Sequence, residues 1–296
     1  MARSSVNLGF HEGKCCDAVL RWFEARLGVE RADLRSPEKE HDSAPVEITC
    51  RLGVQVYALE HTGVEPFDGH VRLQAEAERD FGSVYKGVAG RLPAGDLFEL
   101  HVSARAMQPL NRKERATVQA AIVSWVLSKA PSVVRSPVGR IASPVTREAP
   151  PDVPFQLSLH RYAKPAALDR HFSISHIVQS ATAVEEREAR VYQACARKFP
   201  KLAEWKARAG ARTVLVLEDN DLQLSNPQVI YEALVSAERR LVDRPDEVQL
   251  VVTCVEPEWW HFRLRVDDLT YYQLSQLGGQ MTAFDPGQLT DLMATF

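Results

Sequence analysis

Apolar residues recur along the chain with two different periods. At helical spacing they predict helices over residues 11–27, 66–81, 111–129, 182–208 and 226–242. Shorter runs rich in Val, Ile, Thr and aromatic residues predict strands over 46–52, 54–62, 96–102, 155–162, 172–178, 213–217, 248–255 and 261–266. Gly82 serves as the expected stop of the second helix, and the polar stretch 28–44 is expected to be a loop or an irregular edge.

The order of these elements indicates the fold class. Helices alternate with apolar strands, which predicts an α/β protein with a mixed central β-sheet flanked by helices. Six prolines between positions 131 and 154 indicate a loop or linker. We therefore expect a single α/β domain over 1–296, with a possible insertion at about 85–180.

Composition excludes several classes of protein. Lys plus Arg number 36 and Asp plus Glu 39, so the net charge of -3 argues against a protein that coats nucleic acid, while a local basic groove stays possible. No apolar run approaches the roughly 18 residues that span a bilayer, and the first residues lack the apolar segment of a signal peptide. We expect no membrane association.

The five cysteines point to a reducing compartment. Their number is odd, no Cys-x-x-Cys pair occurs, and Cys15 and Cys16 are adjacent. This pattern excludes zinc ribbons and thioredoxin-like sites and favours buried thiols in a cytoplasmic protein. The sequence also lacks a P-loop, a Gly-x-Gly-x-x-Gly loop, a Gly-x-Ser-x-Gly elbow and a His-Glu-x-x-His pair.

Two glutamates fall on one face of the predicted hairpin over 46–62. With Leu52-Gly53 as its loop, Glu47 faces Ala58 and lies diagonally from Glu60, about 7–8 Å away at the backbone. The other residues of that face in the second strand are apolar, so a buried Glu60 would need a partner. A divalent cation shared by both carboxylates is one solution. An Arg salt bridge, or exposure at the strand end, is the other.

The run from Pro45 to Thr62 resembles the core of the PD-(D/E)XK phosphodiesterase superfamily, which includes many restriction and repair nucleases. Its pattern is an acid after Pro at the start of one strand, then a second acid, one residue and Lys at the end of the next. Glu47 matches the first acid, with Asp42 as a rival, and Glu60 matches the second. The resemblance implies a restriction-endonuclease-like core in which Glu47 and Glu60 hold Mg²⁺ or Mn²⁺.

Two further features bear on the resemblance: a third acidic residue, and the absence of the motif lysine. Glu12 lies on the apolar stripe of the first helix, at the end where a catalytic edge would be, and matches the helical Glu of the superfamily. There it would orient water or a second metal ion. The motif lysine is absent, because position 62 is Thr.

Lys198 is the candidate replacement for that lysine. It lies within the apolar stripe of the helix over 182–208, between Cys195 and Leu202. Its ammonium either snorkels to water or reaches inward to the acids. Lys201 is a weaker candidate, and the acidic run 218–221 is expected to be an exposed loop outside the catalytic set. His61 should point to the opposite sheet face as a core or interface residue.

These features lead to three hypotheses. The first is a metal-dependent nuclease that acts on DNA with Glu12, Glu47, Glu60 and Lys198 as its catalytic residues. The second is a decayed nuclease fold that binds nucleic acid or serves as a scaffold subunit of a bacterial defence or processing complex, as a homodimer or with a partner protein. The third is an unrelated α/β protein whose hairpin acids make salt bridges.

Overall fold

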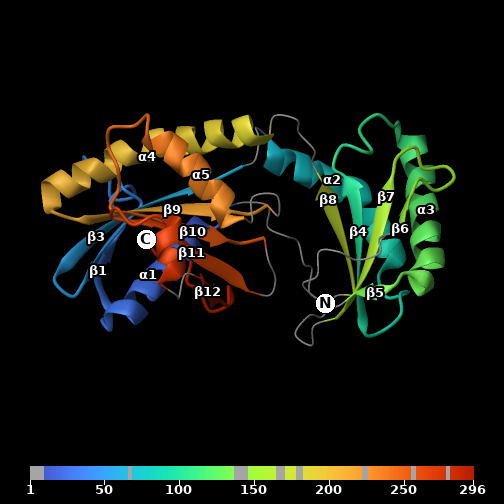
Figure 1. Ribbon diagram of the computed structural model, residues 1–296, viewed down its shortest axis with the longest axis horizontal. Coiled ribbons are helices and arrows are strands. Elements are labelled where there is room, and N and C mark those ends of the chain that lie inside the picture. Colours follow the sequence, from blue (N-terminus) through green and yellow to red (C-terminus); the bar gives the residue numbers. More distant parts are fainter. Residues whose placement is uncertain are drawn as a thin grey trace. The chain divides into compact units, whose positions relative to one another are not determined.

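The computed structural model describes residues 10–65, 69–136, 146–164, 171–177, 183–221, 226–254, 258–277 and 281–296. The chain divides into two compact units (Figure 1). Unit 1 comprises Met1–Asp68 and Thr182–Phe296, and unit 2 comprises Gly69–Ala181. The segment expected at about 85–180 lies within unit 2. Within the described ranges, no helix is long and apolar enough to cross a bilayer.

Unit 1 is built on a seven-stranded sheet. Its order is β1-β2-β3-β9-β10-β11-β12. The central strands β3, β9 and β10 are parallel, and the pairs toward both edges are antiparallel. The strands are β1 Arg31–Arg35, β2 Ile48–Leu52, β3 Gln55–Gly63, β9 Arg212–Asp219, β10 Glu247–Val252, β11 Trp259–Val266 and β12 Met281–Phe284. This mixed sheet confirms the predicted α/β class.

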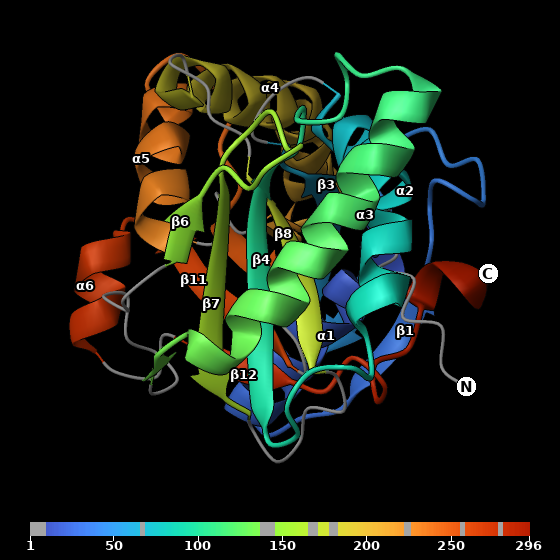
Figure 2. The same ribbon diagram turned by 90° about the vertical axis from the view of Figure 1, so that its right-hand side faces the viewer.

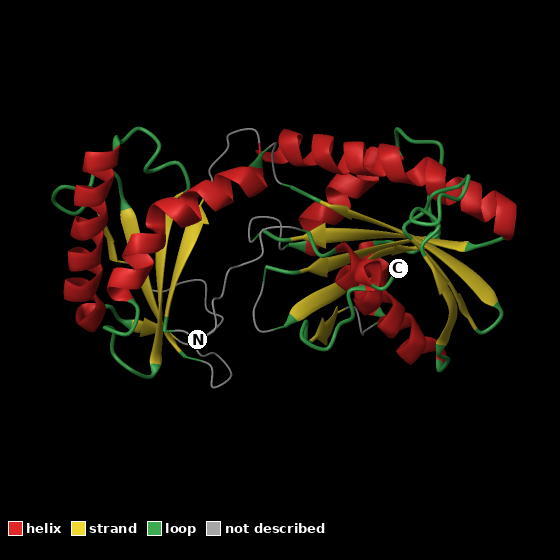
Figure 3. Ribbon diagram, turned by 180° about the vertical axis from the view of Figure 1, so that it is seen from behind, coloured by secondary structure: helices red, strands yellow, loops and turns green. Residues whose placement is uncertain are grey.

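Helices cover both faces of this sheet (Figure 3). Helix α1 (Glu12–Leu27) packs on one face, and α4 (Ala183–Ala209) and α5 (Pro227–Glu238) pack on the other. Along β9, Val214 and Val216 contact the α1 side, whereas Leu215 and Leu217 contact the α4 side. The all-apolar strand expected at 213–217 is therefore buried on both faces, as a central parallel strand should be.

Unit 2 has a second sheet with two helices on one face (Figure 2). Its strand order is β5-β7-β4-β8, with β6 beside β7. The core lies between β4, β7 and β8 and the two helices, around Phe81, Phe98, Ile122 and Leu157. The elements are α2 His70–Val88, β4 Asp96–Ser103, α3 Arg112–Lys129, β5 Arg135–Ser136, β6 Thr146–Glu148, β7 Leu157–Ala163 and β8 Phe172–Ile177, with a short 3₁₀ helix at Ala130–Ser132.

The second helix differs from its predicted extent. Gly82 does not end it, and α2 continues to Val88, because Val84 and Val88 are buried together with Phe81 along one face. Gly87 has a packing role there, since a Cβ added to it would lie 2.8 Å from the Cγ2 of Val123 on α3. Pro66, the expected start of this helix, lies outside the described residues.

The polar stretch 28–44 contains an irregular edge strand. β1 pairs with β2, and its register shifts between Ala32 and Arg35, where Asp33 has a positive φ of 53°. Arg31 ties this strand to α1 through ion pairs with Asp17 and Glu24. Sequence reasoning gave no element for β12, for α6 (Tyr271–Gln276) or for a final 3₁₀ helix at Leu292–Ala294.

The hairpin turn lies one residue later than predicted. Leu52 pairs with Gln55, so the loop is Gly53-Val54 and not Leu52-Gly53. Gly53 has a φ of +61°, which suits the first central position of a type II′ turn. The pairing of Ile48 with Leu59 then places Glu47 directly opposite Glu60, in place of the predicted diagonal relation.

Candidate active site

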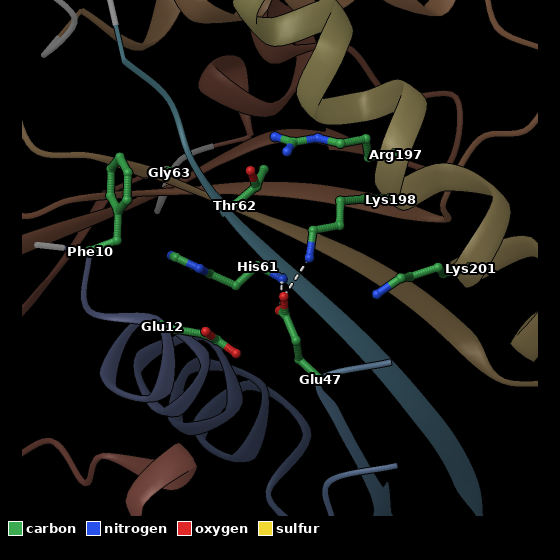
Figure 4. A pocket seen from close by; sticks show the side chains of 9 residues that line it. All are labelled: Phe10, Glu12, Glu47, His61, Thr62, Gly63, Arg197, Lys198 and Lys201. Atoms are coloured by element: carbon green, nitrogen blue, oxygen red, sulfur yellow. Dashed lines mark hydrogen bonds and ion pairs between the residues drawn. The ribbon is translucent and has the colours of Figure 1, made fainter. Parts of the chain in front are cut away.

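Two buried carboxylates face each other where β2 begins and β3 approaches its end. Glu60 is 0% exposed and Glu47 is 5% exposed. Both side chains point to the α4 face of the sheet, because Glu60 alternates with His61 and follows Ala58, which packs in the core beneath α4. The backbone N–H of His61 donates to Glu47 Oε2 and fixes that carboxylate (Figure 4). Neither glutamate is exposed at a strand end.

One lysine joins the two carboxylates. Lys198 Nζ lies 2.5 Å from Glu47 Oε1 and 2.5 Å from Glu60 Oε2. Its side chain is 16% exposed and runs from α4 toward Glu47 (Figure 4). The ammonium does not snorkel to water. The buried residues around it on α4, including Cys195 and Leu202, hold the helix against the sheet at this position, whereas Val184, at the predicted start of the stripe, is exposed.

A second lysine completes the partners of Glu60. Lys201, one turn after Lys198 on α4, places its Nζ 3.3 Å from Glu60 Oε1. Both contacts to Glu60 are ion pairs with lysines, and no other described residue donates to its two buried oxygens. Hard carboxylate oxygens in this condition are suitable ligands for Mg²⁺ or Mn²⁺.

The pKa values of the site residues are also compatible with the binding of a divalent cation. Burial, and then the neighbouring Glu60, raise the pKa of Glu47 to about 8. Burial also raises the pKa of Glu60. Although burial favours a neutral amine, the two carboxylates outweigh it and raise the pKa of Lys198. The carboxylate pair therefore holds a proton more tightly than an isolated glutamate does, and a bound cation would compete with that proton.

An open cavity of about 400 Å³ gives access to this set. It is lined by Glu12 from α1, by Glu47, by the end of β3, and by Arg197, Lys198 and Lys201 from α4 (Figure 4). Glu12 points into it from the side opposite the lysines. The charge of Glu12 contributes to the raised pKa of Glu47, after burial and the larger influence of Glu60. The structure thus brings Glu12, Glu47, Glu60 and Lys198 together.

The α4 side of the cavity is basic. Arg190, Arg197 and Lys201 lie seven and four positions apart, so they share one side of α4 and are separated by about 10 Å and 6 Å along its axis. Arg190 and Arg197 line an adjoining hollow that also includes Phe10 and Gly63. The cavity therefore continues beside a row of cations.

Two other residues that were aligned with the PD-(D/E)XK pattern can be placed relative to the cavity. Asp42, the rival for the first acid, pairs with Arg208 and does not line the cavity. Thr62 lines the cavity at the place of the motif lysine. Because the ammonium comes from α4, the site has a cation although the hairpin supplies none.

The expectation of an exposed loop over 218–221 is wrong. Strand β9 extends through Glu218 and Asp219, and both are 0% exposed. The apolar run before them marks a strand that is covered on both faces, but it does not show how far that strand continues. Glu218 points to the α1 side, as does the ring of His61, whose predicted orientation is confirmed.

Glu218 is held by several donors. Its carboxylate accepts bonds from the backbone N–H of His11 and from the hydroxyl of Thr253, and it contacts the rings of His11 and His61. Burial would raise the pKa of Glu218, but the hydrogen bonds from His11 and His61 outweigh it and bring the pKa to about 2. This buried anion was missed by sequence reasoning.

Comparisons with protein-family models, with curated proteins and with solved structures found no match to this chain. The PD-(D/E)XK resemblance therefore stays an expectation from the hairpin residues of the sequence.

Proposed function

We propose that this protein is a metal-dependent phosphodiesterase that cleaves nucleic acid, with DNA as the expected substrate. The observation that carries the proposal is the pair of buried, facing carboxylates, Glu47 and Glu60, that share the ammonium of Lys198. An arrangement that supports only the fold needs no cavity beside it. Here the ammonium and Glu47 both line an open one.

The residues fit a divalent cation, and each of them has a separate role. Glu47 and Glu60 would hold Mg²⁺ or Mn²⁺, which would activate water and offset charge at the phosphate. When both carboxylates hold the cation, Lys198 is available to donate a hydrogen bond to a non-bridging phosphate oxygen and stabilise the negative charge that develops there. Lys201, which also contacts Glu60, adds a second positive charge beside Lys198.

Glu12 orients the nucleophile. It is half-buried at the cavity wall and accepts a hydrogen bond from the attacking water. The water oxygen forms a bond to phosphorus, the bond from phosphorus to the leaving oxygen breaks, and the water proton passes through Glu12 to solvent. The leaving oxygen takes up a proton, so the products are an alcohol and a phosphate monoester.

The row of cations on α4 supports a nucleic-acid substrate. Arg190, Arg197 and Lys201 extend from the cavity along one side of the helix, where positive charge would attract the phosphates of a bound strand. Phosphate contacts of this kind position a strand without reading its sequence. The net charge of -3 then reflects the rest of the surface and does not oppose local binding.

The test is cleavage of plasmid DNA and of single-stranded DNA with Mg²⁺ or Mn²⁺. We expect Glu60→Gln and Lys198→Met each to lower the rate at least about 100-fold, the usual cost of losing one transition-state contact. Glu247→Gln is the matched control, because Glu247 is similarly buried on β10, two strands away from β3 in the same sheet, and pairs with Arg212 outside the cavity. Cleavage that survives in both site variants would refute the proposal.

The decayed-fold alternative has one observation in its favour, which is Thr62 at the position of the motif lysine. It predicts that the wild type shifts DNA in a gel but cuts none of these substrates. If Mn²⁺ binding measured by calorimetry is also unchanged by Glu60→Gln, Glu60 belongs neither to an active metal site nor to an inactive site that still binds metal.

A further inference from the structure

A second group of ligand-type side chains lies on the other face of the sheet from Glu60. The ligand atoms of Cys15, His61 and Glu218 all lie within 4.8 Å of one another, and all three residues are buried. His11 joins them, because its Nδ1 lies 2.8 Å from Glu218 Oε1. His61 Nε2 lies 3.0 Å from the other oxygen of the same carboxylate.

Three separate elements bring these side chains together. His11 is the N-cap of α1, and Cys15 follows four positions later, so both lie on one side of the first helical turn. His61 comes from β3 and Glu218 from β9, which are parallel neighbours, with Gly63 opposite Glu218 in the register. The ring of His61 extends away from the Glu47 carboxylate (Figure 4).

The kind of ligand selects the kind of metal. A thiolate and imidazoles suit Zn²⁺, whereas Mg²⁺ prefers oxygen ligands only. Charge selects the same ion, because Zn²⁺ with one thiolate, one carboxylate and two neutral imidazoles has no net charge. A buried group with no net charge avoids the cost of an unpaired ion in the interior.

We propose that Cys15 Sγ, His61 Nε2 and a Glu218 oxygen bind one structural Zn²⁺, with His11 Nδ1 as the fourth ligand. Binding releases the thiol proton to solvent and turns the imidazole nitrogens toward the ion in place of the carboxylate. Four protein ligands make a closed site, which is typical of structural zinc. The ion links the start of α1 to β3 and β9, and Glu12, the residue after His11, depends on that link for its position in the cavity.

Cobalt substitution tests the site directly. Metal-free, reduced full-length protein is titrated with Co²⁺ in excess Mg²⁺. We expect one equivalent to bind with the absorption bands of tetrahedral cobalt and a thiolate-to-cobalt charge-transfer band, and Zn²⁺ to displace it. Cys15→Ser should lose the charge-transfer band, whereas Cys50→Ser, which removes another buried thiol from the same core, should keep it.

Two further measurements keep the result decisive. If Cys15→Ser does not fold, X-ray absorption of the zinc-loaded wild type must show one sulfur together with nitrogen or oxygen ligands. Failure of the wild type to bind Zn²⁺ or Co²⁺ at equimolar concentration, or a shell without sulfur, overturns the inference. Glu60→Gln should bind zinc normally, so a failure here is distinguishable from a failure of the proposed hydrolysis.

Discussion

Replacing Glu47 by Gln should stabilise the metal-free protein. Its carboxyl has a pKa of about 8 in the folded chain, because it is buried and faces Glu60, against about 4.5 for an unperturbed glutamate. A raised pKa means that the folded state binds more protons than the unfolded state. The stability contributed by this group is therefore complete below pH 4.5 and is lost as the pH rises toward 8.

The magnitude follows from the size of the pKa difference. At pH 7 the unfolded state gains about 2.5 pH units of ionisation free energy that the folded state does not, at about 1.4 kcal/mol each, which is about 3 kcal/mol. A neutral glutamine avoids this loss and can still accept the His61 N–H. We expect Glu47→Gln to be more stable than the wild type by up to about 3 kcal/mol at pH 7 and nearly equal to it at pH 4.

Urea unfolding between pH 4 and pH 8 with a chelator present measures this difference, with tryptophan fluorescence as the signal. Glu24→Gln is the control of opposite sign, because Arg31 holds the pKa of Glu24 below its ordinary value despite partial burial. Its stability should fall at neutral pH. A Glu47→Gln protein that is less stable than the wild type at pH 7, with a gap independent of pH, would refute the reasoning.

Three further predictions concern the same site. Lys198→Met leaves two buried carboxylates without their shared ammonium. The free energy of unfolding measured in urea should fall by about 3–5 kcal/mol at pH 8 and by less at pH 5. An equal loss at both pH values would contradict this prediction. Arg197→Ala should weaken DNA binding and reduce the slope of log affinity against log salt by about 0.9, the share of one phosphate; an unchanged slope would exclude the contact. Mn²⁺ affinity should rise with pH up to about 8, since the cation must displace the proton of Glu47, and calorimetry that finds constant affinity from pH 6 to 9 would count against this.

The convergence of the two acids could be predicted from the hairpin alone. Side chains alternate along each strand, so Glu47 and Glu60 share a face in either two-residue loop that contains Gly53. The two loops differ in register by two residues. This difference changes which residue lies opposite Glu47, but it leaves both glutamates on the same face of the sheet. The preference of a type II′ turn for Gly at its first central position would have selected the observed register.

The direction of the Lys198 ammonium could not be predicted. Its place in an apolar stripe is compatible with a stem that is buried and an amine in water. The choice depends on what lies beneath the helix at that point, and this is set by the packing of α4 on β3 across a long sequence separation. Lys201, three positions later, has the same helical face and could have been ranked beside it.

Burial of Glu218 was beyond sequence reasoning for a related cause. Four acidic or amide residues in succession are typical of a solvated turn. Here the sheet continues past the apolar run, and donors from distant segments, His11 and Thr253, compensate the carboxylate. Only the folded arrangement brings those donors to it.

The interruption of unit 1 by unit 2 has a consequence for how the protein folds. Glu60 ends up beside Lys198 only after a loop of more than a hundred residues is closed. Closing such a loop as a disordered coil costs about 2 kcal/mol more chain entropy than closing one of about ten residues. Early folding of residues 69–181 would shorten the effective loop, so unit 2 should act as an internal folding aid. Variants that slow its folding should delay the appearance of a competent site, even though every residue lining the cavity belongs to unit 1.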